Sequence, residues 1–248
     1  MTENLRNNNL NNQKYKNKRV TIMAKTISIA IDGPAGAGKS TIAKRLAKEL
    51  GYYYVDTGAI YRTVAYFMDL LGIAPKDTDG VSRYIDELNI EIEYDEDGLQ
   101  HMLMNGMDVT EDIRTPDISQ KASLISAQPL VREMLLDMQR DMAKKHNVIM
   151  DGRDIGTVVL PRANIKIFLT ASAEIRAKRR HLELQAKGSK DSFEKVLADI
   201  KQRDHQDSTR AIAPLKQAKD AILVDTSEMD VETSVAVIRR IVDEKVGA

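Results

Sequence analysis

The residues best suited to chemistry in this 248-residue chain form the octapeptide Gly-Pro-Ala-Gly-Ala-Gly-Lys-Ser at 33–40, which satisfies G-x-x-x-x-G-K-[ST] in full. The glycines let backbone N–H groups turn around a phosphate, and the helix expected next would favour an anion. Lys39 is predicted to reach the β- and γ-phosphates of ATP, and the Ser40 hydroxyl to ligate Mg²⁺. The predicted ATP-binding residues here are Gly33, Pro34, Ala35, Gly36, Ala37, Gly38, Lys39, Ser40 and Thr41.

A second polar motif, Asp151-Gly152-Arg153-Asp154, follows the short apolar run at 148–150. A carboxylate at a strand end can hold Mg²⁺ directly or through water, so Asp151 joins Ser40 as a predicted metal residue. Arg153 and Asp154 indicate a bound substrate that carries both an anionic group and a hydrogen-bond donor. The simpler alternative is a polar turn, because Asp-Gly is a common turn dipeptide.

Five arginines are spaced so that they can meet at the carboxyl-end crevice of a parallel sheet: Arg62, Arg132, Arg153, Arg203 and Arg210. Phosphoryl transfer requires charge neutralisation and in-line positioning, which arginines, a lysine and Mg²⁺ supply. No strong base is expected, since an acceptor phosphate is already a nucleophilic anion. A single arginine is more often a solvated surface residue, so this prediction depends on the five converging.

The segment 176–192 is rich in Lys and Arg and has a Lys187-Gly188 hinge. It is interpreted as a mobile lid that closes over ATP and expels water, with Arg176 and Arg179 reaching the phosphates. An exposed basic helix pair is the alternative.

Around these motifs, β-branched runs at 26–32, 52–56, 148–150, 165–170 and 221–224 alternate with helical patterns. The helical patterns cover 42–50, 58–71, 117–145, 173–186, 192–209 and 230–244. This order predicts an α/β fold: a three-layer P-loop core with a parallel sheet. Alternation at 88–94 and 99–104 around Asp97-Gly98 predicts a small antiparallel insert at about 80–115.

Composition narrows the class of protein. With 42% hydrophobic residues, zero net charge and no cysteine, the chain is a globular protein without disulfides or thiolate chemistry, as expected in a reducing cytoplasm. No apolar run has the roughly 20 residues of a membrane span, and no signal peptide is recognisable. Residues 1–25 are Asn-rich and basic, so they are predicted to be a disordered leader before a domain at 26–248. Met23 is a candidate start codon.

These motifs in combination resemble the bacterial cytidylate (CMP) kinases over roughly residues 27–245. The segments that carry the resemblance are IDGPAGAGKST (31–41), DTGAIYR (56–62), the acidic insert, DGRDIGTVVLP (151–161) and IKQRDHQDSTRAIAPL (200–215). The resemblance implies a nucleoside-monophosphate kinase with a mobile lid, an acceptor region that includes the insert, and Mg²⁺-ATP as phosphoryl donor. It also implies that the chain acts as a monomer on CMP or dCMP.

The resemblance further assigns the acceptor-binding residues. Arg62, Arg153 and Arg210 are expected at the acceptor phosphate and the transferring group. Ser123, Arg132 and Asp154 are expected at the cytosine edge, and Arg203 and Asp207 at the pentose. Thr57 stands where the family often has Ser, so a hydroxyl is kept. The residues predicted to be catalytic are Lys39, Arg153, Asp154, Arg203 and Arg210.

Two alternatives remain at this stage. One is another small P-loop kinase that acts on shikimate, gluconate or dephospho-coenzyme A. The other is a nucleotide-dependent switch or a nucleic-acid-binding ATPase that uses the basic leader and lid. Zero net charge and the lack of an aromatic stacking platform argue against a nucleic-acid partner.

Overall fold

The computed structural model describes residues 26–247, so the leader predicted at 1–25 lies outside the described residues. The core is a five-stranded parallel sheet in the order β2-β6-β1-β7-β8. The strands are β1 (Ser28–Asp32), β2 (Tyr53–Asp56), β6 (Val148–Gly152), β7 (Ile165–Thr170) and β8 (Ile222–Asp225). Every residue of the inner strand β6 is buried, as expected where helices cover both faces of a sheet. The predicted α/β fold is confirmed.

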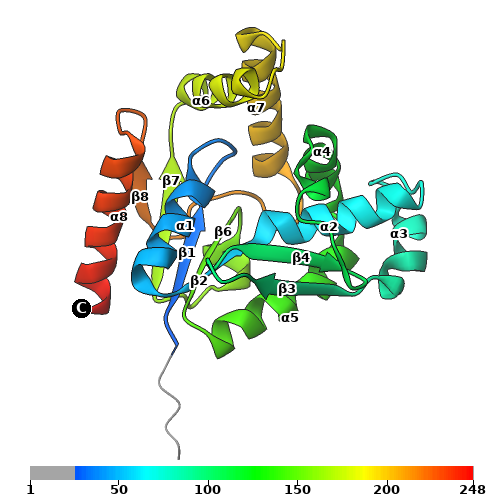
Figure 1. The fold of residues 1–248 in the computed structure, drawn as a ribbon, viewed down its shortest axis with the longest axis horizontal. Coiled ribbons are helices and arrows are strands. Elements are labelled where there is room, and N and C mark those ends of the chain that lie inside the picture. Colours follow the sequence, from blue (N-terminus) through cyan, green and yellow to red (C-terminus); the bar gives the residue numbers. More distant parts are fainter. Residues whose placement is uncertain (1–25, 248) are drawn as a thin grey trace, which may run out of the picture.

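Helices cover the two faces of the sheet and bury separate apolar clusters (Figure 1). On one face, α1 (Lys39–Leu50) and α8 (Val231–Val246) pack around Leu46 and Ile238. On the other face, α2 (Thr57–Leu70) contributes Ile60 to the second cluster. The register places Asp32 beside Gly152 and Asp56 beside Asp151, so polar residues of three strands meet at the carboxyl edge.

The helix predicted at 117–145 is two helices, so that prediction is wrong. They are α4 (Pro116–Ile125) and α5 (Pro129–Lys145). Pro129 has no N–H and disfavours helical geometry in the residue before it, and Gln128 is accordingly extended at φ −80°, ψ 126°. The break has a consequence for the site, because the free carbonyl of Ser126 accepts a hydrogen bond from Arg132 Nη1 at 3.1 Å.

The insert comprises α3 (Thr78–Tyr84), the short 3₁₀ turns η1 (Ile85–Glu87) and η2 (Asp112–Arg114), and an antiparallel sheet. Its strands are β3 (Ile90–Tyr94), β4 (Gln100–Met104) and the unpredicted β5 (Met107–Asp108). Two side chains join it to β2, the edge strand of the core sheet: Tyr94 Oη donates to the Tyr54 carbonyl at 2.8 Å, and Gln100 Oε1 accepts from the Asp56 N–H at 2.7 Å. They satisfy backbone groups that an edge strand leaves unpaired.

The helical hairpin α6 (Ala173–Ala186) and α7 (Phe193–Thr209) projects beyond the sheet, above the P-loop in Figure 1. Its own small cluster, Ala177, Val196 and Ile200, is separate from the two large ones. This hairpin contains the segment predicted as a lid, and its motion stays a prediction. Among residues 26–247, no helix has the length and apolar character needed to cross a membrane.

Candidate active site

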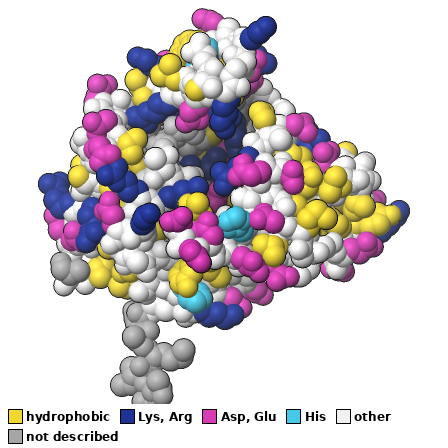
Figure 2. Space-filling view, viewed as in Figure 1, with side chains coloured by type: hydrophobic (Ala, Val, Ile, Leu, Met, Phe, Trp, Pro, Cys, Tyr) yellow, Lys and Arg dark blue, Asp and Glu magenta, His cyan; other side chains and the backbone are white. Residues whose placement is uncertain are grey.

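A cavity of about 770 Å³ opens at the carboxyl edge of the sheet, beneath the α6–α7 hairpin. In Figure 2, Lys and Arg side chains gather in and around this hollow. The arginines that line it are Arg62, Arg153, Arg180, Arg203 and Arg210. Of the five arginines predicted to converge, four line the cavity, whereas Arg132 is absent from its lining and contacts it through the ion pair with Asp154. Arg180 is an addition that the sequence interpretation missed.

The P-loop side of the cavity, residues 33–40 with Asp151, is shaped by glycine. At Gly33 a Cβ atom would lie 1.9 Å from the Leu169 carbonyl oxygen, so no other residue lets the loop pass β7. Helix α1 starts behind Gly38 without a side-chain cap, which leaves its first N–H groups for a ligand. Lys39 Nζ donates to the Pro34 carbonyl at 2.9 Å, and burial together with the nearby Arg153 lowers the pKa of Lys39 to about 7. An anion at this position would favour the charged lysine.

Ser40 and Asp151 lie together as predicted for a metal site. Ser40 Oγ donates to Asp151 Oδ2 at 2.9 Å, and Tyr54 Oη donates to Asp151 Oδ1 at 2.8 Å. Burial, with the Asp56 carboxylate nearby, raises the pKa of Asp151. No cluster of three or more His, Cys, Asp or Glu side chains suited to a metal occurs in residues 26–247. One carboxylate and one hydroxyl are hard oxygen donors, a set that fits Mg²⁺ arriving with phosphate and water ligands.

The arginine side of the cavity, Arg132, Arg153, Asp154, Asp207 and Arg210, is a network of ion pairs. Asp154 is buried between two guanidinium groups: Arg132 Nη2 pairs with Oδ2, and Arg210 Nη2 lies 3.2 Å from Oδ1. Burial raises the pKa of Asp154, and both arginines oppose that shift. Asp154 therefore presents a carboxylate whose orientation two partners set.

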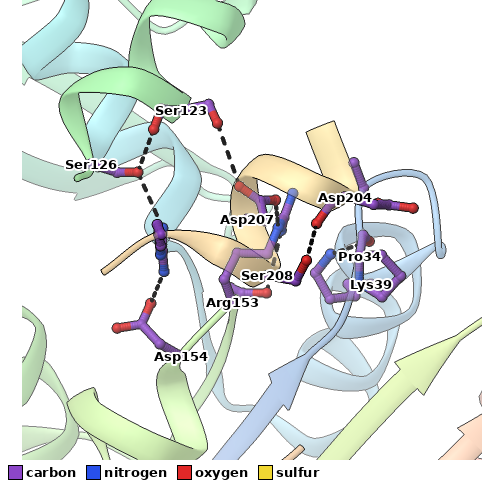
Figure 3. Close-up of polar contacts among 12 residues, drawn as sticks. Pro34, Lys39, Ser123, Ser126, Arg153, Asp154, Asp204, Asp207 and Ser208 are labelled. Atoms are coloured by element: carbon purple, nitrogen blue, oxygen red, sulfur yellow. Dashed lines mark hydrogen bonds and ion pairs between the residues drawn. The ribbon is translucent and has the colours of Figure 1, made fainter. Parts of the chain in front are cut away.

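Two serines of α4 and its C-terminal end complete this network (Figure 3). Ser126 Oγ, which the sequence interpretation missed, accepts from Arg210 Nη1 at 3.2 Å and donates to the Ser123 carbonyl at 2.8 Å. Ser123, a predicted base-reading residue, donates weakly to Asp207 Oδ1 at 3.4 Å. The sequence signal that could have indicated Ser126 is Pro129, which predicts a break between α4 and α5.

Arg153 Nε pairs with Asp207 Oδ2 at 2.7 Å. Burial alone would raise the pKa of Asp207, but the Arg153 guanidinium outweighs burial and lowers it. Arg203 is half-buried, and its buried Nε has no hydrogen-bond partner among the described residues. Burial and the neighbouring Arg153 lower its pKa to about 10. Arg62 pairs with Asp56 at 3.0 Å. Several guanidinium groups close together beside a lysine form a site that requires an anion for balance.

Comparison with known proteins identifies the family to which this chain belongs. The family model described as cytidylate kinase matches residues 29–244. Cytidylate kinase of Carboxydothermus hydrogenoformans is 50% identical over 217 residues, covering 88% of this chain and 97% of that protein. Cytidylate kinase of Exiguobacterium sp. is 47% identical over 222 residues, covering 90% and 99%. The chain belongs to the cytidylate kinase family.

Membership of the cytidylate kinase family confirms the resemblance and the assignment of the chain as an enzyme with kinase activity. It does not favour the shikimate, gluconate or dephospho-coenzyme A alternatives, nor a nucleic-acid-dependent ATPase. The individual roles of the site residues remain predictions.

Two predicted ATP-binding residues, Arg176 and Arg179, are not among the residues that line the cavity in this member of the cytidylate kinase family. Arg176 forms a bidentate pair with Asp204 at 2.6 and 3.0 Å and donates to the Ala35 carbonyl at 3.0 Å. Arg179 donates to the Thr226 carbonyl at 2.6 Å. Contact of either with ATP would require these bonds to change. Arg180 lines the cavity, and within residues 26–247 its one ion-pair partner is the exposed Glu183 at 3.1 Å.

Thr57, predicted for acceptor binding, lines the cavity but is buried. Its Oγ1 donates to the Asp151 carbonyl at 2.7 Å, which ties the start of α2 to the end of β6. The hydroxyl is therefore used within the protein, and a contact between Thr57 and an acceptor stays a prediction.

Proposed function

We propose that this chain transfers the γ-phosphoryl group of ATP to CMP or dCMP, giving CDP or dCDP and ADP. The observation that supports this most is the Asp154 carboxylate, buried between Arg132 and Arg210 in the same cavity as a complete P-loop. The names of its relatives agree, since each is a cytidylate kinase at about half identity over most of its length.

The choice of base follows from hydrogen bonding. Cytosine offers an amino donor at N4 and acceptors at N3 and O2, which complement a carboxylate on Asp154 and donors on Arg132 and Ser123. Uracil presents an acceptor where cytosine has its amino group, so Asp154 would face it unpaired, at a cost of about 1–3 kcal/mol. CMP and dCMP should therefore react better than UMP.

The phosphates would occupy the cationic part of the cavity. Lys39 and the P-loop N–H groups bind the β- and γ-phosphates of ATP, while Arg62, Arg153 and Arg210 hold the acceptor phosphate in line. Asp207 and Arg203 lie at the pentose, and Arg203 also approaches the transferring group. No residue needs to remove a proton, because the acceptor phosphate attacks as an anion.

Ser40 and Asp151 would hold Mg²⁺, which when bound with ATP neutralises phosphate charge. The α6–α7 hairpin would close over the nucleotides, bringing Arg180 towards them and excluding water. Acting as a monomer in the cytoplasm, on small-molecule substrates and without nucleic acid or membrane, is part of the same proposal.

An acceptor panel tests the function. Purified protein is incubated with ATP and Mg²⁺ plus CMP, dCMP, UMP, AMP, GMP or no acceptor, and ADP release is coupled to a spectrophotometric readout. Strong release with CMP and dCMP, weak release with UMP and negligible release without acceptor support the proposal. Release that is independent of every monophosphate overturns it.

A further inference from the structure

Asp32, the last residue of β1, is a buried carboxylate, 4% exposed, for which the proposed reaction gives no role. Its Oδ1 accepts from the Ile155 N–H at 2.8 Å, and its Oδ2 accepts from the Gly156 N–H at 2.7 Å. These residues begin η3 (Ile155–Val159), a single π-helical turn directly after Asp154. The first N–H groups of a helical turn lack partners within it, so Asp32 supplies them from the adjacent strand.

The surroundings are built for this contact. The β1–β6 register places Asp32 beside Gly152, two residues before Asp154. A Cβ on Gly156 would lie 3.3 Å from Asp32 Oδ2 and 3.1 Å from Lys166 Cδ, so glycine allows the close approach of the carboxylate. Only a carboxylate offers two acceptor oxygens and no donor at this size; asparagine would turn an N–H₂ group toward one of the two backbone donors.

We infer that Asp32 is a positioning residue for acceptor recognition, which holds the start of η3 and thereby aims Arg153 and Asp154 into the cavity. The Asp154 carbonyl in turn accepts from the Val158 N–H at 2.8 Å, so backbone hydrogen bonding ties Asp154 to η3. Asp32 acts through backbone bonds and touches no substrate. The inference rests on the proposed function, because it assigns Asp154 to the acceptor.

The alternative role for Asp32 is to shape the P-loop, because Asp32 directly precedes Gly33. The two roles differ in which substrate is affected. A residue that only shapes the P-loop would change the binding of ATP, whereas a residue that aims Asp154 changes the binding of CMP and its preference over UMP.

The test compares Asp32→Asn with Asn164→Ala. Asn164 is a matched control, because its Oδ1 accepts from the Ser28 N–H at 2.9 Å at the opposite end of the same strand. We expect Asp32→Asn to raise KM for CMP about tenfold, the effect of one lost charge-assisted hydrogen bond. It should also lower the CMP-to-UMP preference and leave KM for ATP within about twofold, and Asn164→Ala should change none of these.

Equal increases in both KM values, or no change in either, overturn the inference. Amide hydrogen exchange of residues 155–160 gives a readout without turnover, and faster exchange in Asp32→Asn is expected. This exchange measurement tests the inference about Asp32 without requiring turnover of CMP. The proposed function is tested independently, by the reaction of the wild-type protein with CMP. If Asp32→Asn does not fold, Gly156→Ala, whose Cβ would crowd the Asp32 carboxylate and the Lys166 side chain, should give the same CMP-selective rise in KM. An equal rise in KM for ATP contradicts the inference.

Discussion

The P-loop side and the arginine side of the cavity are stabilised by different interactions. The P-loop side depends on backbone: glycine conformation, the start of α1 and a lysine held by the Pro34 carbonyl. The arginine side depends on buried ion pairs between side chains of α5, α7 and the segment after β6. A local sequence motif can encode the first kind of site, but the second exists only after distant segments have packed.

The difference also concerns the state without substrate. On the arginine side, Asp154 and Asp207 neutralise guanidinium groups, so CMP must replace or join existing pairs. On the P-loop side, the one hydrogen-bond partner of Lys39 in the described part of the chain is the Pro34 carbonyl, and burial and Arg153 lower the pKa of Lys39 to about 7. We therefore expect substitutions on the two sides to weaken the binding of different substrates.

The largest effect is expected on the P-loop side. Lys39→Met keeps the aliphatic volume but removes the charge that meets the transferring phosphoryl group, so kcat should fall about 1,000-fold. Steady-state kinetics at saturating CMP and ATP measure this loss. Lys48→Met, on the exposed face of the same helix, is the control and should keep wild-type turnover. A decrease under tenfold for Lys39→Met would contradict the assignment.

Asp32 should give the free energy of unfolding an unusual dependence on pH. Burial raises its pKa from 3.8 to about 6 despite the two backbone donors. Because the native pKa exceeds the unfolded one, the native state binds more protons in this window. The contribution of Asp32 to the free energy of unfolding therefore falls as pH rises from about 4 to 6, by an amount on the order of 3 kcal/mol, and is constant above it.

Urea unfolding of wild type and Asp32→Asn at several pH values between about 4 and 7 measures this slope. The difference in unfolding free energy between the two proteins should shift in favour of the variant as pH rises. Parallel stability curves would mean that Asp32 titrates alike in the native and unfolded states.

On the arginine side, Asp154→Asn leaves Arg132 and Arg210 without their shared counter-charge and turns an amide donor toward cytosine N4. We expect kcat/KM for CMP to fall about 100-fold and the preference over UMP to nearly disappear. The acceptor panel measures both. Asp243→Asn, which removes the exposed pair with Arg239 at 2.8 Å, is the control. Retained discrimination in Asp154→Asn would place base recognition elsewhere.

The smallest effect should come from the insert. Gln100→Ala removes the acceptor for the Asp56 N–H, and Asp56 both caps α2 and pairs with Arg62. Loss of one neutral hydrogen bond should raise KM for CMP about fivefold. Leu99→Ala, an exposed neighbour on the same hairpin, should have no effect. An unchanged KM for CMP in Gln100→Ala would show that the insert does not support the Asp56–Arg62 pair.

The contrast between the two sides explains what the sequence could predict. The P-loop, its flanking strand and helix, and the strand ending at Asp151 lie in continuous segments with clear periodicity, and their positions were confirmed. The strands at 165–170 and the helix at 173–186 have the predicted bounds. The single helix predicted at 117–145 is wrong, because Pro129 keeps Gln128 out of helical geometry and so divides the segment into α4 and α5.

Other features depend on packing that no local pattern records. Ser126, Tyr54 and Asp32 became recognisable only when their partners, 84 to 123 residues away, were in place. Arg176 illustrates the reverse case: its charge and position predict a phosphate ligand, and in this structure its guanidinium joins the P-loop to α7, so a contact with ATP stays a prediction. Residue type predicted the chemistry, and the fold decided which side chain faces the cavity.

Binding of ATP and CMP, each measured separately by isothermal titration calorimetry, tests the division of the cavity most directly. Three proteins are compared: wild type, Lys39→Met and Asp154→Asn. Lys39→Met should bind CMP with wild-type affinity and ATP at least tenfold more weakly, and Asp154→Asn should show the opposite pattern. If both variants lose affinity for both ligands to the same degree, the cavity does not consist of two separable sides.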